Sequence, residues 1–241
     1  MDSREALIRF RAGGGRPPSS HEVLLVGPES AWYLTGMPWP SQPPFDEIGA
    51  YRADLGAASS AGLEELARAA AEEPAASGGD PDLGTEAVRF GGSESRWSPE
   101  GRSRAAEAFV ATAREVIAEL RTQPWSVARG GLHDGRLELV NPGEHPLELG
   151  EGEAHVGFGR PDRPPSPLRL VVEPATALDL PSHLGPDAPA IRPLPDPGSP
   201  RPDYPDHDAV YALVHLPFRS PLEGEGSDGW IDGWLLCGPA S

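Results

Sequence analysis

The spacing of apolar side chains predicts one long amphipathic helix in the middle of the chain, from about residue 98 to residue 122. Ser98 is a suitable N-cap, Pro99 suits the first helical position, and Pro124 ends the pattern. The apolar positions recur three or four residues apart and so share one helical face. The core-facing residues that we expect are Phe109, Val110, Ile117 and Leu120.

Two further segments have helical patterns. Residues 59–73 are rich in alanine, and Leu63, Leu66 and Ala70 lie at helical spacing. Residues 4–10 mix charged and apolar side chains and precede the glycines at 13–15. We therefore expect a short amphipathic helix at residues 4–10, ended by these glycines.

Most of the predicted strands lie in the second half of the chain. Residues 22–27 predict a buried strand, and residues 31–34 a strand or short helix. The later strand segments are 136–140, 147–149, 155–158, 168–172, 209–216 and 230–237. Because residues 209–216 are apolar on both faces, we expect this strand to lie in the centre of its sheet.

The pattern as a whole predicts an α+β fold in one globular domain, residues 1–241. An antiparallel or mixed sheet, mainly from the C-terminal half, would pack against the long amphipathic helix. Residues 181–205 hold nine prolines, which cannot donate to a β-ladder. We expect this segment to be a long irregular loop within the domain, and the fold to contain other long loops rich in proline and glycine.

Composition excludes several kinds of chemistry. All twenty strongly basic side chains are arginine, so no lysine can form a Schiff base or hold a nucleotide phosphate in a P-loop. Asparagine and isoleucine are also scarce. This bias indicates a gene under GC pressure, as in a high-GC bacterium or its phage; the alternative is selection against lysine.

A net charge of −17 limits the partners of the protein. It argues against nucleic acid and against anionic membranes, because both need a basic surface on the protein. It favours a basic protein partner or a cationic small molecule. The alternative is that the charge serves only solubility.

The single cysteine, Cys237, lies in an apolar run and predicts a buried core thiol. One cysteine cannot form an intrachain disulfide, which fits a reducing compartment. We see no signal peptide at the N-terminus and no apolar run near the ~18 residues of a membrane span. We therefore expect a cytoplasmic protein.

The densest polar cluster lies just before residues 209–216 and consists of Asp203, Asp206, His207 and Asp208. Carboxylates and an imidazole in one segment could bind a divalent metal or perform acid–base catalysis. The simpler interpretation is a solvated loop in which aspartates form turns.

Known motifs of catalysis and of metal binding are missing from the sequence. It has no HExxH and no GxSxG, and its seven histidines form no pair with ligand spacing. The glycines at 13–15 do not form a GxGxxG pattern. A zinc site made of thiolates is excluded by the single cysteine. We therefore expect no cofactor and no tightly bound transition metal.

Tryptophan and tyrosine are enriched at binding hot spots, so the aromatic clusters are candidate interface residues. These residues are Trp32, Tyr33, Trp39, Trp230 and Trp234. The alternative is that they anchor the core or its loops.

One segment resembles a known family. Residues 21–37, from His21 to Met37, include the stretches Leu-Leu-Val-Gly-Pro-Glu-Ser and Tyr-Leu-Thr-Gly. They resemble the strand and turn at the start of the creatinase/prolidase amino-terminal domain, and residues 4–10 resemble the helix before it. The resemblance covers about 17 residues, and the metal ligands of that family's catalytic domain have no counterpart here. No functional residue is carried over.

Two classes of function follow. The first is a non-enzymatic binding or accessory protein, of the immunity type or an assembly subunit, which the acidic composition and the missing catalytic motifs favour. The alternative is a metal-assisted hydrolase that uses the cluster at residues 203–208. Enzymatic activity is the less favoured of the two.

Overall fold

Strands dominate the structure. The computed structural model describes residues 6–14, 20–37, 46–54, 57–74, 84–160, 171–172, 174–196 and 209–238. Strands account for 52% of it and helices for 17%. The expected α+β fold, organised around a long helix, is therefore wrong: a large multi-strand sheet forms the framework, and the helices of the described segments are short.

The main sheet is antiparallel throughout and has nine strands among the described residues, in the order β14-β8-β7-β4-β3-β2-β1-β5-β6. These strands are β1 (Ile8–Gly14), β2 (Ser20–Val26), β3 (Ser30–Met37), β4 (Glu47–Asp54), β5 (Thr85–Phe90), β6 (Ser93–Trp97), β7 (Pro124–His133), β8 (Arg136–Val140) and β14 (Ala190–Pro193). Eight of them precede residue 141, so the prediction of a sheet mainly from the C-terminal half is also wrong for this sheet.

A second sheet comes from the C-terminal part, in the order β11-β10-β15-β18, with β12 paired to β10. Its strands are β10 (Gly152–Gly159), β11 (Val171–Val172), β12 (Thr176–Leu178), β15 (Ala209–His215) and β18 (Trp234–Cys237). Strand β15 lies between β10 and β18, which confirms the central position predicted for residues 209–216. Two small ribbons pair β9 (Leu147–Glu148) with β13 (His183–Leu184) and β16 (Phe218–Arg219) with β17 (Trp230–Ile231).

Two α-helices are present in the part that the structure describes, α1 (Ala57–Ala71) and α2 (Arg104–Leu120). Helix α2 begins later than predicted, because Arg102 has an extended backbone (φ −64°, ψ 134°). Ser98 caps only the short 3₁₀ turn η2 (Pro99–Gly101), and Ser103 caps α2 by accepting from the Ala106 amide. The predicted core-facing residues Phe109, Val110, Ile117 and Leu120 are all buried.

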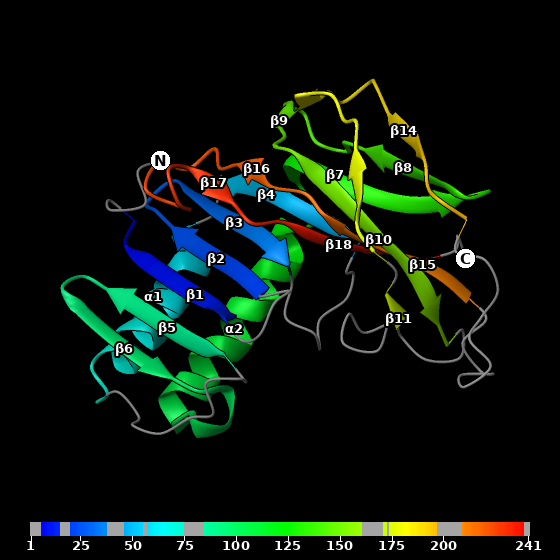
Figure 1. Cartoon of the computed structure of the whole chain (residues 1–241). Helices are drawn as coiled ribbons and strands as arrows, with labels where there is room; N and C mark the ends of the chain where they lie inside the picture. Colours follow the sequence, from blue (N-terminus) through cyan, green and yellow to red (C-terminus); the bar gives the residue numbers. More distant parts are fainter. Residues whose placement is uncertain are drawn as a thin grey trace.

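Both helices cover one face of the main sheet, and the second sheet packs on the opposite face (Figure 1). Phe10, Leu24 and Tyr33 belong to the core on the helix side. Val23, Leu25 and Leu34 belong to the core between the sheets. Among the described residues, this inter-sheet core includes no buried residue from β1, β5 or β6. The edge of the main sheet formed by these strands therefore has one face that the second sheet does not cover.

The predicted helix at residues 4–10 is wrong, because residues 8–10 belong to strand β1. Ile8, Phe10 and Ala12 are buried, whereas their neighbours are more exposed, which is the period of two that a strand requires. Residues 21–37, which resemble the creatinase/prolidase strand and turn, form the β2–β3 hairpin.

The turn between β7 and β8 has the dipeptide that two-residue hairpin turns favour. The β7–β8 hairpin turns at Asp134 and Gly135, which have φ of 50° and 72°, as a two-residue Asp-Gly turn needs. The proline-rich segment 181–205 contains the short strands β13 and β14, and its residues from 197 onward lie outside the described part. None of the helices in the described ranges is long and apolar enough to cross a membrane.

Candidate functional site

The residues singled out by sequence do not form one site. Asp203, Asp206, His207 and Asp208 lie outside the described residues, as does Trp39. Within the described ranges, no three His, Cys, Asp or Glu side chains are arranged to hold a metal ion.

The other aromatic residues fall into two groups. Tyr33 is fully buried and Trp32 is 7% exposed, so both are core residues that offer little surface to a partner. Trp230 and Trp234 are half-buried. The Trp234 ring stacks on His215, with the centroids 4.5 Å apart, and Trp230 lines the pocket described below.

The uncovered face of β1, β5 and β6 carries arginines. Since Ile8, Phe10 and Ala12 point to the helices, Arg9 and Arg11 point to the opposite face. Arg9 lies directly opposite Arg89 of β5. Arg11 lies opposite Ala87, which lies opposite Arg96 of β6. The register therefore brings four guanidinium groups from three strands to one surface, with the small side chain of Ala87 among them.

A buried carboxylate anchors this arginine face. Glu225 belongs to the loop between β16 and β17, and it has no exposed surface. Its Oε1 lies 2.5 Å from Arg9 Nη2, and its Oε2 accepts from Arg11 Nη2 at 2.8 Å. Gly224 and Gly226 on either side have φ of 79° and 84°. These left-handed conformations allow the loop to turn sharply, so that the Glu225 side chain contacts the arginines of β1.

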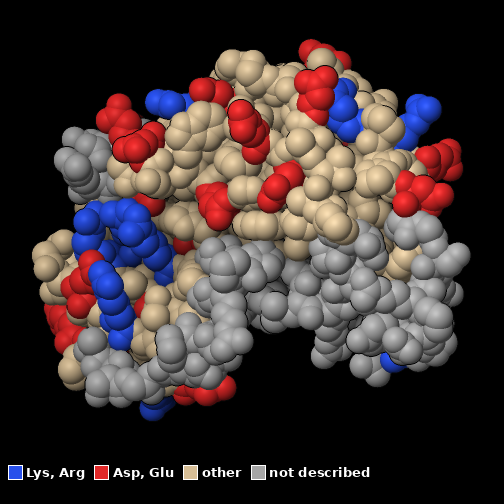
Figure 2. Space-filling view, viewed as in Figure 1, with Lys and Arg blue, Asp and Glu red and all other residues tan. Residues whose placement is uncertain are grey.

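The arginine face and this loop enclose a pocket of about 740 Å³. We call it the arginine pocket; its charged and aromatic lining residues are Arg9, Arg11, His21, Glu22, Arg89, Glu94, Arg96, Trp230 and Asp232. Figure 2 shows a blue patch at the left of the molecule, where Figure 1 places β1, β5 and β6, while carboxylates are scattered over the other described parts of the face in view. The pocket is thus a local concentration of arginine on an acidic protein.

The carboxylates near the pocket are engaged. Glu94 is paired with Arg96, with a contact of 2.7 Å, and Asp232 is hydrogen-bonded to His215. Glu22 points to the helix side, because its strand partner Ala12 is part of that core. On the pocket face itself, the carboxylates of Glu94, Glu225 and Asp232 therefore lie near four arginines.

Buried polar atoms at the base of the pocket lack partners. Arg9 Nε and His21 Nε2 are buried and form no hydrogen bond. Desolvation lowers the pKa of the Arg9 guanidinium, and the charges of Arg11 and Arg89 add to this effect while Glu225 opposes it. Burial also lowers the pKa of His21. Unsatisfied buried groups of this kind are found where a water, an ion or a ligand binds.

The shifted pKa of His21 predicts a pH dependence of stability. A histidine of the unfolded chain titrates near pH 6.5, and the lower folded pKa means that the unfolded state takes up the proton first. The contribution of neutral His21 is therefore present above about pH 6.5 and is lost as the pH falls. Below pH 6.5, the free energy of unfolding should fall more steeply in the wild type than in His21→Gln, by up to about 1.4 kcal/mol per pH unit. Urea titrations between pH 5 and 8 measure this, and equal slopes would contradict it.

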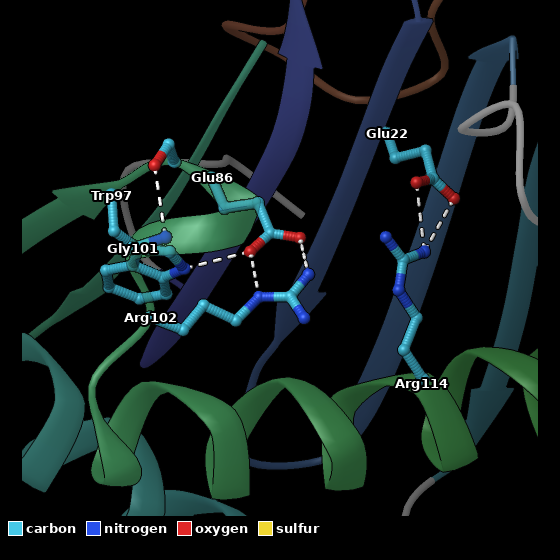
Figure 3. Close-up of polar contacts among 7 residues, drawn as sticks. Glu22, Glu86, Trp97, Gly101, Arg102 and Arg114 are labelled. Atoms are coloured by element: carbon cyan, nitrogen blue, oxygen red, sulfur yellow. Dashed lines mark hydrogen bonds and ion pairs between the residues drawn. The ribbon is translucent and has the colours of Figure 1, made fainter. Parts of the chain in front are cut away.

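On the helix side of the sheet, Arg102 and Arg114 each pair with a buried carboxylate. Figure 3 shows Glu86 accepting from Arg102 Nε at 2.7 Å, Arg102 Nη2 at 2.6 Å and Trp97 Nε1 at 2.9 Å. It also shows Glu22 accepting twice from Arg114 Nη1 of α2, at 2.9 Å. Both carboxylates are almost fully buried. Since each arginine here meets its own carboxylate, these pairs attach α2 and its N-terminal approach to the sheet.

Two tyrosine hydroxyls also donate to buried carboxylates, and together with the pairs above they form a layer of buried polar contacts. Tyr33 donates to Glu22, and Tyr51 donates to Glu47, which also contacts Arg129. Burial raises the pKa of both tyrosines, and the neighbouring carboxylates add to the shift, so each phenol remains a neutral donor. We interpret this layer as structural, because its polar groups satisfy one another inside the fold.

Cys237 has no catalytic setting. It is fully buried, and burial raises the pKa of its thiol far above the usual value. A low-pKa, accessible thiolate is what a reactive cysteine needs. We expect native protein at pH 8 to resist iodoacetamide and to be alkylated once unfolded, as mass spectrometry would show. Rapid alkylation of native protein would contradict the buried position.

Sequence reasoning missed the arginine pocket. The available signal was the alternation Ile8-Arg9-Phe10-Arg11-Ala12, which places arginine on one face of a strand and apolar residues on the other. The pairing of β1 with β5, and so the encounter of Arg9 with Arg89, was not visible in the sequence. No protein-family model matches the chain, and neither the curated proteins nor the solved structures gave a significant match.

Proposed function

We propose that this protein is a non-enzymatic binding protein, an accessory or immunity-type subunit, and that it holds an anionic group of its ligand in the arginine pocket. The observation that carries the proposal is the position of Arg9 directly opposite Arg89, with Arg11 and Arg96 on the same face. Like charges directly opposite each other destabilise a sheet. A bound anion would offset this cost, because guanidinium groups bind carboxylates, sulfates and phosphates with two parallel hydrogen bonds.

The proposal assigns no chemistry to the pocket. Its arginines are cations under all ordinary conditions and cannot act as general bases. The histidine in its lining, His21, is a buried group with a lowered pKa and no hydrogen bond at Nε2. We therefore propose recognition of an anion without turnover.

The net charge of −17 supports a second element of the proposal, a basic protein partner that meets the acidic surface outside the pocket. Its association rate should fall as salt rises, since salt screens exposed charges over about 8–10 Å. An association rate independent of salt would mean that the acidic surface serves only solubility.

Calorimetric titration with sodium sulfate at constant ionic strength tests the anion site. We expect saturable binding at one site in the wild type. In Arg11→Gln and in Arg89→Gln binding should be about tenfold weaker, as the loss of one charge-assisted hydrogen bond implies.

Arg136→Gln is the matched control, because Arg136 is an exposed residue of β8 far along the sheet order from β1 and its replacement changes the net charge equally. It should bind sulfate as the wild type does. No saturable binding to the wild type, or equal weakening in the control, would overturn the proposal.

A further inference from the structure

We propose that two copies of this protein pair through the outer edge of strand β6, as antiparallel neighbours related by a two-fold axis at Ser95. This pairing goes beyond the proposed anion site and does not depend on it. Three features of β6 support it: its place at the end of the sheet, the direction of its free backbone groups, and the order of its charges.

Strand β6 is the last strand of the main sheet, and among the described strands it pairs with β5. The pairing covers all five residues of β6 without a register shift, and the strand contains no proline. A regular edge of this kind presents N–H and C=O groups to which another strand can bond. The side chains of Glu94 and Arg96 on this edge are 40% and 71% exposed.

The β5–β6 hairpin determines which backbone groups point outward. Phe90 pairs with Ser93 across a two-residue turn, and Gly91, the first residue of the turn, has a φ of 58°. In such hairpins the flanking pair exchanges both backbone hydrogen bonds, and alternate residues then point away from the partner strand. The N–H and C=O groups of Glu94 and Arg96 therefore point outward. In the described part of the chain, neither residue has a backbone hydrogen bond to another element.

The charges of these two residues select one register for a second copy. Glu94 could lie opposite Glu94, Arg96 opposite Arg96, or Glu94 opposite Arg96. The first two registers place like charges directly opposite each other, which destabilises a sheet, whereas the third places opposite charges there. In the third register the outward N–H and C=O groups of both residues find partners, and the small side chain of Ser95 lies at the axis. The edge of β6 is thus complementary to itself.

The contact that exists within one copy is compatible with this register. Arg96 already lies 2.7 Å from Glu94 of its own strand. In the pair, each carboxylate would lie between its own guanidinium and that of the second copy, so the charges alternate around the axis. On the face of the arginine pocket, Arg89 lies opposite Glu94. The second copy would add one arginine and one glutamate beside β6 on this face.

Sedimentation equilibrium of the full chain measures the pairing, at pH 7.5 in sodium chloride of about 0.15 M. This salt screens the repulsion between two copies of net charge −17 over about 8 Å and leaves closer pairs in force. One strand pair is a small interface, and small interfaces belong to weak complexes. We therefore expect a reversible equilibrium of monomer and dimer between about 10 µM and about 1 mM. Because a two-fold contact uses each edge once, it should produce no larger assembly.

Charge reversal tests the register. Glu94→Arg or Arg96→Glu alone places like charges opposite each other in both cross-strand pairs, and each should weaken the dimer by about tenfold or more. An equimolar mixture of the two variants should associate about as tightly as the wild type, because the arginines of one then face the glutamates of the other. The double variant with both substitutions should also recover the wild-type affinity.

The matched controls are Arg136→Glu on β8 and Glu115→Arg on α2, two exposed positions outside β6 with the same changes of charge. Both should associate as the wild type does, within about twofold. A wild type that stays monomeric up to about 1 mM, or a dimer that survives both single reversals, would overturn the proposal. Weakening that the mixture and the double variant do not reverse would overturn it too, as would equal weakening in the controls. The readout is mass, so none of these outcomes depends on anion binding.

Discussion

Glu225→Gln is expected to lower the free energy of unfolding by about 3 kcal/mol. Among the described contacts, Glu225 is the carboxylate that forms an ion pair with the largely buried Arg9, and the variant removes its charge. The Glu225 side chain has no exposure, and that of Arg9 is 14% exposed. Breaking a buried ion pair by neutralising one member costs ~3–5 kcal/mol, and we place this case at the lower end because Arg11 is half exposed. Urea denaturation at pH 7.5 measures the loss.

Glu223→Gln is the matched control for this prediction. Glu223 lies two residues away in the same loop and is exposed, so the same change of charge should alter the stability by less than about 0.5 kcal/mol. A loss below 1 kcal/mol in Glu225→Gln would mean that Glu225 does not anchor the loop to Arg9 and Arg11.

Phe109→Ala should destabilise the protein by about 3–5 kcal/mol, as truncation of a buried phenylalanine does. Phe109 of α2 has no exposed surface and meets the Phe10 ring of β1 edge to face, with the centroids 5.5 Å apart. The truncation would remove this contact and leave a cavity between the helix and the sheet. Thermal or urea denaturation would report the loss.

Phe109→Leu keeps most of the buried volume and should cost clearly less than the alanine variant. On the exposed face of the same helix, Glu115→Ala should have an effect within about 0.5 kcal/mol. If Phe109→Ala matched Glu115→Ala, the position of α2 against β1 would be wrong.

Local patterns predicted some of the fold. The stripe from Ala106 to Leu120 identified the buried face of α2, and the apolar run at 209–216 identified a central strand. The Asp134-Gly135 turn was readable because both residues adopt a positive φ that this dipeptide favours. These features depend on residues close together in the chain.

The fold class was not predictable in the same way, because the main sheet is built from short strands with long-range partners. The partners of β4 and β7 lie 73–82 residues apart in the chain, and those of β1 and β5 lie 72–82 residues apart. Several of these strands carry glycine, arginine or glutamate, such as β6 with Glu94 and Arg96, and lack a clear apolar alternation. The helical stripe was the strongest local signal, and it was therefore given too much weight in the predicted architecture.

The arginine pocket was unpredictable for the same reason. Its side chains come from β1, β5, β6 and the loop after β16, and only the register of the strands brings them together. The sequence emphasised Asp203, Asp206, His207 and Asp208 because they are adjacent in the chain. The net charge of the whole chain, −17, gives no indication of a local cluster of positive charge.

The most direct test of the central claim is a titration of the arginine Nε–H signals by NMR, with sodium sulfate added at pH 7.5. The chain has twenty arginines and no lysine, so its charged side-chain donors can be followed in one spectrum and assigned with single variants. The account predicts saturable shifts at Arg9, Arg11 and Arg89, with Arg136 unchanged. Shifts spread evenly over the exposed arginines, or confined to residues outside the pocket, would contradict it.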